Sequence, residues 1–100
     1  MRRLSPHVAT SRVVGWASDQ PERHAFVLDC LARHHRHDWG DLDPHDWDLN
    51  DRAVGCQSGR VLSTYVVPAE LAPLDASLWI ITDDLESADA PTTILWPSDY

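Results

Sequence analysis

The chain has 100 residues, of which 43% are hydrophobic, and its formal net charge is −8 at neutral pH. This length and hydrophobic content are typical of one ordered globular domain, so we expect residues 1–100 to form a single domain. The acidity disfavours direct binding to nucleic acid, because an acidic surface repels phosphates. The sequence contains no apolar run long enough for a membrane span, no secretion signal and no C-x-x-C cysteine pair, so we expect a cytoplasmic protein.

The charge is distributed unevenly along the chain. Residues 37–51 hold six aspartates and no basic residue other than histidine, and residues 61–100 hold seven acids and no base. Residues 1–36 carry six arginines against three acids, and the chain contains no lysine. Strong acidity serves either solubility or the binding of a basic protein partner. Composition alone leaves both interpretations open.

The first helix is predicted to begin near Asp19 and to end at Gly40. Residues 19–22 resemble a capping box with Pro21 in the first turn, and Val27, Leu31 and His34 follow with helical spacing. Residues 1–18 are expected to be irregular or to add a strand at 8–14.

The second helix is predicted to begin at Pro44, with Asp43 as its N-cap. Leu42 and Trp47 have the spacing of a hydrophobic staple, which fixes the angle between the incoming chain and the helix. Gly55 is expected to end the helix, and the mixed polarity of its faces indicates a position at the edge of the core.

Three strands are predicted in the second half of the chain, at residues 60–67, 77–82 and 91–96. They are rich in β-branched and aromatic residues, and the connectors between them contain proline and acidic residues. The strand at 77–82 is apolar on both faces and is expected to be central. The fold class is therefore a small α+β domain, in which two N-terminal helices pack on an antiparallel sheet of three strands, or four if residues 8–14 join it.

The segments DWGDL at 38–42, LWIIT at 78–82 and TTILWPSDY at 92–100 resemble a family of short bacterial proteins. Plasmids and phages carry these proteins, which are described as plasmid-related, and some are labelled as subunits of restriction systems. The resemblance covers roughly residues 30–100 and implies a mobile genetic element as the context, with no enzymatic activity or cofactor attached to it. The chain departs from the family in its longer connector at 68–76 and in the acidic stretch 83–91, where relatives carry an arginine.

The histidines and aspartates of residues 34–46 raise the alternative of a metal-binding or hydrolytic domain. His34 and His37 have the spacing of helical ligand pairs, and His45 would join them if the two helices fold back on each other. The chain has no H-E-x-x-H sequence, no closely spaced cysteine pair and no nucleophile in a known catalytic context. We therefore predict no catalytic residue, no cofactor and no enzyme, and treat these three histidines as weak metal-ligand candidates.

The preferred hypothesis is a non-enzymatic interaction protein that inhibits a host defence system. Its acidic surface would bind a basic host protein, such as a CRISPR effector or a restriction enzyme, with charge steering the approach. A third alternative is a structural subunit that forms a homodimer through an exposed strand edge. The predicted partner-binding residues are Asp38, Trp39, Asp41, Asp46, Asp48, Asp83, Asp84 and Glu86.

Overall fold

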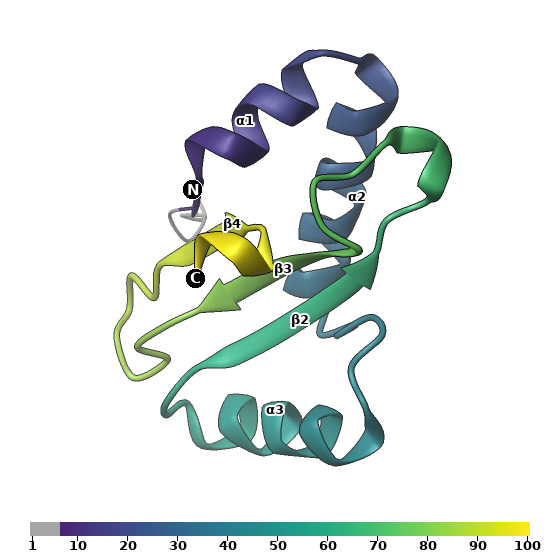
Figure 1. The fold of residues 1–100 in the computed structure, drawn as a ribbon. Coiled ribbons are helices and arrows are strands. Elements are labelled where there is room, and N and C mark those ends of the chain that lie inside the picture. The colour runs from purple at the N-terminus through teal and green to yellow at the C-terminus, as the bar shows by residue number, and fades with distance from the viewer. Residues whose placement is uncertain (1–6) are drawn as a thin grey trace.

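A four-stranded mixed sheet forms the centre of the protein in the computed structural model, which describes residues 7–100 (Figure 1). The helices are α1 (Ser11–Ser18), α2 (Pro21–His35) and α3 (Pro44–Cys56), with short 3-10 turns η1 (Ala69–Leu71) and η2 (Pro97–Asp99). The strands are β1 (His7–Ala9), β2 (Val61–Val66), β3 (Ser77–Thr82) and β4 (Thr92–Leu95). Their order in the sheet is β1-β4-β3-β2; β2, β3 and β4 are antiparallel, and β1 runs parallel to β4.

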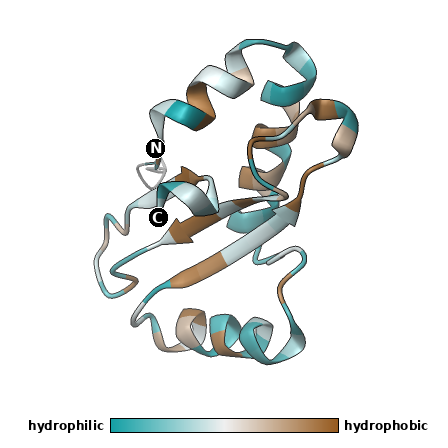
Figure 2. Cartoon of the chain, in the orientation of Figure 1, coloured by the Kyte–Doolittle hydropathy of each residue, from teal (hydrophilic) through white to brown (hydrophobic). Residues whose placement is uncertain are grey.

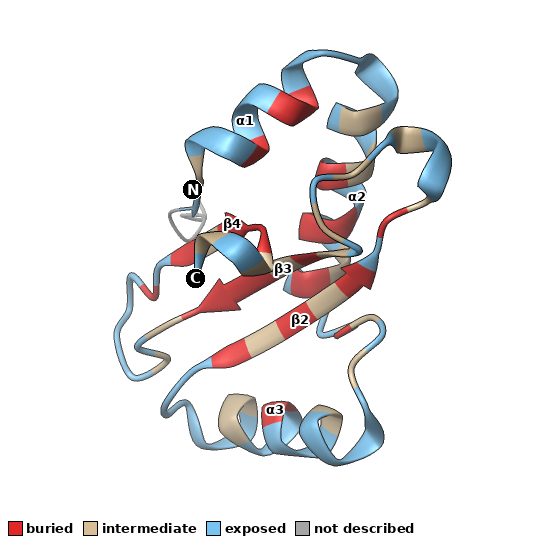
Figure 3. Ribbon diagram, viewed as in Figure 1, coloured by how far each residue is buried: buried red, intermediate tan, exposed pale blue. Residues whose placement is uncertain are grey.

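The helices α1 and α2 cover one face of the sheet. Since successive residues of a strand point to opposite faces, alternate residues of each strand are buried against these helices. Figure 3 shows this alternation along β2. The buried cluster takes side chains from both helices, from β2, β3 and β4, and from the residues directly after β2 and β4, namely Val13, Trp16, Ala17, Val27, Cys30, Leu31, Tyr65, Val67, Leu78, Ile80, Ile94 and Trp96. In contrast, α3 lies beside β2 at the edge of the sheet (Figure 1).

The predicted α+β class is confirmed, and several boundaries agree closely with the sequence patterns. The central strand spans residues 77–82 as expected, and α3 begins at Pro44 with the Asp43 carboxylate accepting a hydrogen bond from the backbone N–H of Asp46 at 3.0 Å. The fourth strand is the short β1, and it pairs in parallel rather than antiparallel. The helix α3 continues through Gly55, the residue predicted to stop it, and ends at Cys56, followed by Gln57 in the left-handed conformation.

The prediction of a strand at residues 8–14 is wrong for most of that segment, because residues 11–18 form α1. Thr10 caps this helix by accepting a hydrogen bond from the backbone N–H of Val13, and Val13, Trp16 and Ala17 are buried with helical spacing. The expectation of irregular structure at 1–6 lies outside the described residues.

The bounds of the next helix also differ from the prediction. The N-cap of α2 is Gln20, whose side chain makes no capping hydrogen bond, while Asp19 belongs to the end of α1. The helix ends at His35 rather than at Gly40. Gly40 instead lies in the connection to α3, where it has a φ of +73° and approaches β2.

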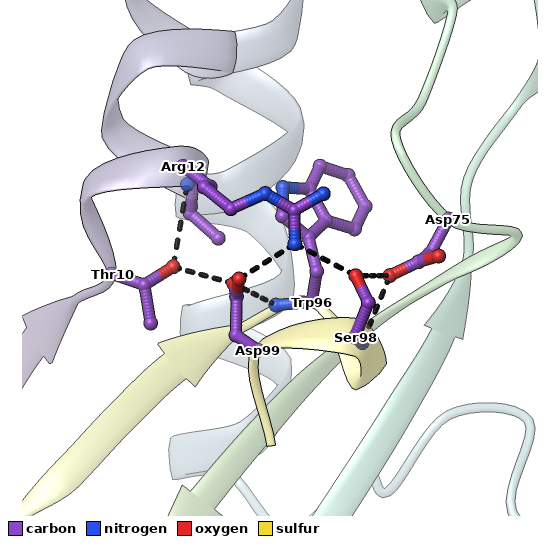
Figure 4. A network of polar contacts seen from close by, with 7 residues as sticks. Thr10, Arg12, Asp75, Trp96, Ser98 and Asp99 are labelled. Carbon is purple, nitrogen blue, oxygen red and sulfur yellow. Dashed lines mark hydrogen bonds and ion pairs between the residues drawn. The ribbon is translucent and has the colours of Figure 1, made fainter.

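A polar network joins the start of α1 to the turn η2, as Figure 4 shows. The Asp99 carboxylate accepts hydrogen bonds from the Thr10 hydroxyl at 2.8 Å and from the Arg12 guanidinium at 2.7 Å. Arg12 also donates to the Ser98 hydroxyl, which in turn donates to Asp75. The network therefore connects segments that are more than 80 residues apart in the sequence.

Candidate interaction surface

The DWGDL segment, residues 38–42, lies along the outer edge of β2. The backbone N–H of Thr64 donates to the carbonyl of Trp39 at 3.2 Å, and the N–H of Asp41 donates to the carbonyl of Thr64 at 2.7 Å. Between them, Gly40 comes so close that a Cβ atom there would lie 2.1 Å from the Thr64 carbonyl oxygen. Glycine is therefore required by the contact as well as by its positive φ.

Two side chains also form hydrogen bonds with the outer edge of β2, at the residues on either side of Thr64. The side chain of Asp41 accepts a hydrogen bond from the backbone N–H of Val66 at 2.8 Å. The side-chain amide of Asn50, in α3, donates to the carbonyl of Leu62 at 2.7 Å and accepts from its N–H at 3.4 Å. The edge of β2 is thus already paired, which disfavours the alternative of a homodimer formed by strand addition at this edge.

Asp38 and Asp41, two of the predicted partner-binding residues, have structural partners within the protein. Arg33 makes two hydrogen bonds with the Asp38 carboxylate, at 2.8 and 3.3 Å, and lies over the ring of Tyr65. The hydrogen bond from Arg33, together with one from the backbone N–H of Gly40, lowers the pKa of Asp38. Much of the negative charge of Asp38 is therefore balanced before any partner arrives.

The prediction that Trp39 contacts a partner is corrected by its burial. Its side chain is 1% exposed, its ring stacks on His37, and its indole N–H donates to the Asp51 carboxylate at 2.9 Å. A ring with so little exposed surface has no area to offer to another protein. Trp39 instead connects the loop after α2 to α3.

His34 is the centre of a buried chain of hydroxyl groups that the sequence patterns did not predict. Its Nδ1 lies 2.6 Å from the Ser63 hydroxyl, its Nε2 lies 2.8 Å from the Thr82 hydroxyl, and Thr82 lies 2.8 Å from the Thr92 hydroxyl. Burial, with smaller contributions from the neighbouring imidazoles of His35 and His37, lowers the pKa of His34 to about 4. The imidazole is therefore neutral near pH 7, with one nitrogen donating and the other accepting.

The three candidate metal ligands do not come together. Both ring nitrogens of His34 have hydroxyl partners, His37 stacks on Trp39, and His45 is exposed on α3. Within residues 7–100, no group of three or more His, Cys, Asp or Glu side chains is arranged to hold a metal ion. A small cavity of about 110 Å³ beside His34 is lined largely by imidazole, hydroxyl and apolar groups, which supplies no carboxylate for the hydrolytic alternative.

The remaining predicted acids are at the surface, in two groups. Asp46 and Asp48 are exposed on α3, a helix whose only buried residue is Asn50 (Figure 3). Asp48 forms an ion pair with Arg52 at 2.9 Å, but both side chains are more than half exposed. Exposed pairs of this kind contribute little to stability and exchange easily with other partners.

The second group follows β3, in the loop that contains Asp83, Asp84 and Glu86. This loop packs on the turn after α3, where the backbone N–H of Leu85 donates to the carbonyl of Gly59 at 2.8 Å and Glu86 accepts from the Gly59 N–H at 2.9 Å. Asp84 is exposed and forms no ion pair with an arginine in the part of the chain that the structure describes, whereas Asp83 is half-buried and interacts electrostatically with Arg60. The fold therefore brings the acidic loop next to the end of α3.

Comparisons with protein-family models, with curated proteins and with solved structures found no match for this chain. Across residues 7–100, every helix is too short or too polar to cross a membrane.

Proposed function

We propose that this chain is a small non-enzymatic interaction protein that binds a basic surface of another protein. The observation that carries the proposal is the exposure of Asp46 and Asp84, neither of which forms an ion pair with an arginine among residues 7–100, with the half-buried Asp83 next to Asp84. Exposed carboxylates on adjoining elements create a negative potential that attracts a basic partner and accelerates its approach.

The proposed partner is a host nucleic-acid-binding defence protein, a CRISPR effector or a restriction enzyme, encountered in the cytoplasm. The choice follows from the resemblance to proteins of mobile genetic elements and from charge, because the nucleic-acid channels of such enzymes are basic. Binding there would inhibit the enzyme by occupying the surface that its nucleic acid or a subunit needs.

The test is a binding measurement on a triple variant, Asp46→Asn with Asp83→Asn and Asp84→Asn. Purified CRISPR effectors and restriction enzymes are titrated with wild type and variant at low and at physiological salt. We expect at least one of them to bind the wild type, with affinity falling as salt rises, and the variant to bind at least about tenfold more weakly.

The matched control removes three exposed acids elsewhere on the molecule, Glu22, Asp29 and Glu70. It makes the same change in net charge, so it separates a local acidic surface from overall acidity. If both triple variants weaken binding equally, the result contradicts a binding surface defined by Asp46, Asp83 and Asp84. Absence of binding to every enzyme tested contradicts the choice of partner, and unchanged affinity of the first variant contradicts the role of these acids.

A further inference from the structure

Two hollows flank the first half of α3, and both are lined by Leu42. The larger, about 390 Å³, lies between α3 and β2 and is lined by Leu42, Asp46, Leu49, Asn50, Arg60 and Leu62. The smaller, about 320 Å³, lies on the other flank of the helix, next to Trp47. Apolar side chains therefore line a hollow on either side of this helix, and hydrophobic and hydrophilic residues are interspersed along it (Figure 2).

The larger hollow exists because α3 is attached beside the sheet rather than on it. The contact between α3 and β2 rests on the amide of Asn50, whose hydrogen bonds place the helix next to the strand edge. Leu62 points away from the face that α1 and α2 cover and is half-buried. Leu49, the next residue before Asn50 on α3, is 49% exposed. The two leucines therefore contribute to an apolar depression that no element among residues 7–100 covers.

One acidic side chain lines this depression, and a second is exposed close to it in the chain. Asp46 is exposed and lines the depression, and Asp43, three residues earlier at the N-cap of α3, is also exposed, whereas Asp48 lines the hollow on the other flank of the helix. The one arginine of the lining, Arg60, has its guanidinium 5.8 Å from the ring centre of Tyr100 and also interacts electrostatically with Asp83. An apolar depression with these exposed acids is complementary to a basic segment that carries an apolar side chain.

We infer that the depression between α3 and β2 receives one apolar side chain of a basic segment of the partner, while neighbouring arginines or lysines of that segment pair with Asp43 and Asp46. The inference rests on the proposed function and specifies the chemistry of the partner: alternating basic and apolar residues rather than basic residues alone. A second copy of this chain is a poor occupant, because it would bring the same aspartates against those already there.

The test uses two short peptides, one with leucine flanked on each side by two arginines and one with serine in place of the leucine. Each is titrated by NMR at low salt against the full chain and against Leu49→Ser. We expect the leucine peptide to bind about five- to tenfold more tightly than the serine peptide, and Leu49→Ser to remove this difference while leaving binding of the serine peptide unchanged.

Leu28→Ser is the matched control, because Leu28 is exposed to a similar extent, 51%, but lies on α2. It should preserve the preference for the leucine peptide. Thermal unfolding of each variant verifies that the fold is intact, and Leu49→Ala repeats the measurement with a smaller change.

The outcomes separate the two proposals. Equal binding of both peptides to the wild type overturns the apolar site and leaves the acidic surface standing. If neither peptide binds, both the attraction of a basic segment and the proposed apolar site are contradicted. A wild-type dimer that Leu49→Ser converts to monomer, with no preference between the peptides, would assign the depression to self-association instead.

Discussion

The side chain of Asn50 is bonded to the backbone of Leu62 in the way a neighbouring strand would be, with its amide donating to the carbonyl and its oxygen accepting from the N–H. Together with the backbone of residues 39–41 and the carboxylate of Asp41, it pairs the edge of β2. Unpaired strand edges promote aggregation, and proteins commonly cover them with loops or helices. One amide thus both protects the sheet and positions α3.

We predict that Asn50→Ala lowers the free energy of unfolding by about 2 kcal/mol, because both hydrogen bonds are lost and the Leu62 backbone groups are only partly rehydrated. Urea unfolding measures the change. Asp48→Asn, two residues earlier on the same helix, breaks only an exposed ion pair and should cost less than about 0.5 kcal/mol. Similar costs for the two variants would contradict the structural role of Asn50.

Gly40→Ala is expected to be far more damaging, at about 3 kcal/mol or more. The new methyl group would collide with the carbonyl oxygen of Thr64, and the residue would have to hold a φ of +73°. Gly15→Ala is the control: it lies in α1, and outside its chain neighbours and the helix's own backbone no atom lies within 4 Å of the added carbon, so it should stabilise by about 0.5–1 kcal/mol. Denaturant unfolding of both variants tests the prediction, which fails if Gly40→Ala is tolerated.

Burial of neutral His34 should make stability depend on pH. Its folded pKa, about 4, lies below the value of 6.5 for an exposed histidine, so the unfolded chain binds more protons between these two values. The free energy of unfolding should therefore fall by about 3 kcal/mol as pH is lowered from 6.5 to 4, from this residue alone. Urea unfolding across this range measures the loss.

The variant His34→Gln isolates this contribution, because it removes the titrating group while keeping a polar side chain. Its stability should vary less steeply with pH over the same range, whatever its absolute value. NMR titration of the wild type should show one histidine with a midpoint near pH 4. Parallel pH profiles for the two proteins would show that His34 is not the group responsible.

Asp99→Asn should lower the melting temperature at pH 7, because Asp99 accepts hydrogen bonds from Thr10, Arg12 and the backbone of Trp96. Burial opposes ionisation of Asp99, but the bonds from Arg12 and Thr10 outweigh it and lower its pKa. The stability that Asp99 contributes is therefore fully present at pH values above the pKa of an exposed aspartate. It is lost as the pH falls through the lower pKa that Asp99 has in the folded protein. Calorimetry at pH 7 and pH 3 should show a smaller difference between variant and wild type at the lower pH. Asp29→Asn, an exposed acid on α2, should have little effect at either pH.

Local signals explain which elements the sequence predicted well. The start of α3 follows from Asp43 and Pro44, which act on the backbone within one helical turn. The central strand follows from its β-branched and apolar residues, bounded by polar connectors. Each of these signals lies within the element that it specifies or directly next to it, so no tertiary context is needed to interpret it.

The features that were missed depend on distant parts of the chain. Pairing of His7 with Thr92 decides that residues 7–9 are a strand, and no short pattern contains both. The spacing of His34 from His37 suggests a metal ligand, whereas its spacing from Val27 and Leu31 places it on the buried stripe of α2. Its hydroxyl partners, Ser63 and Thr82, come from two different strands. Burial of Trp39 likewise depends on α3 folding back over the loop before it.

The pairing of β1 with β4 also constrains the order in which the protein can assemble as it is synthesised. Residues 7–12 leave the ribosome long before residues 92–99, which supply both the strand and the carboxylate that they contact. Until then, the apolar residues of α1 lack part of the surface against which they finally pack, including the ring of Trp96, which contacts Trp16. A nascent chain stalled before residue 92 should therefore expose α1 to chaperones and proteases, whereas α3 and the hairpin of β2 and β3 can already form.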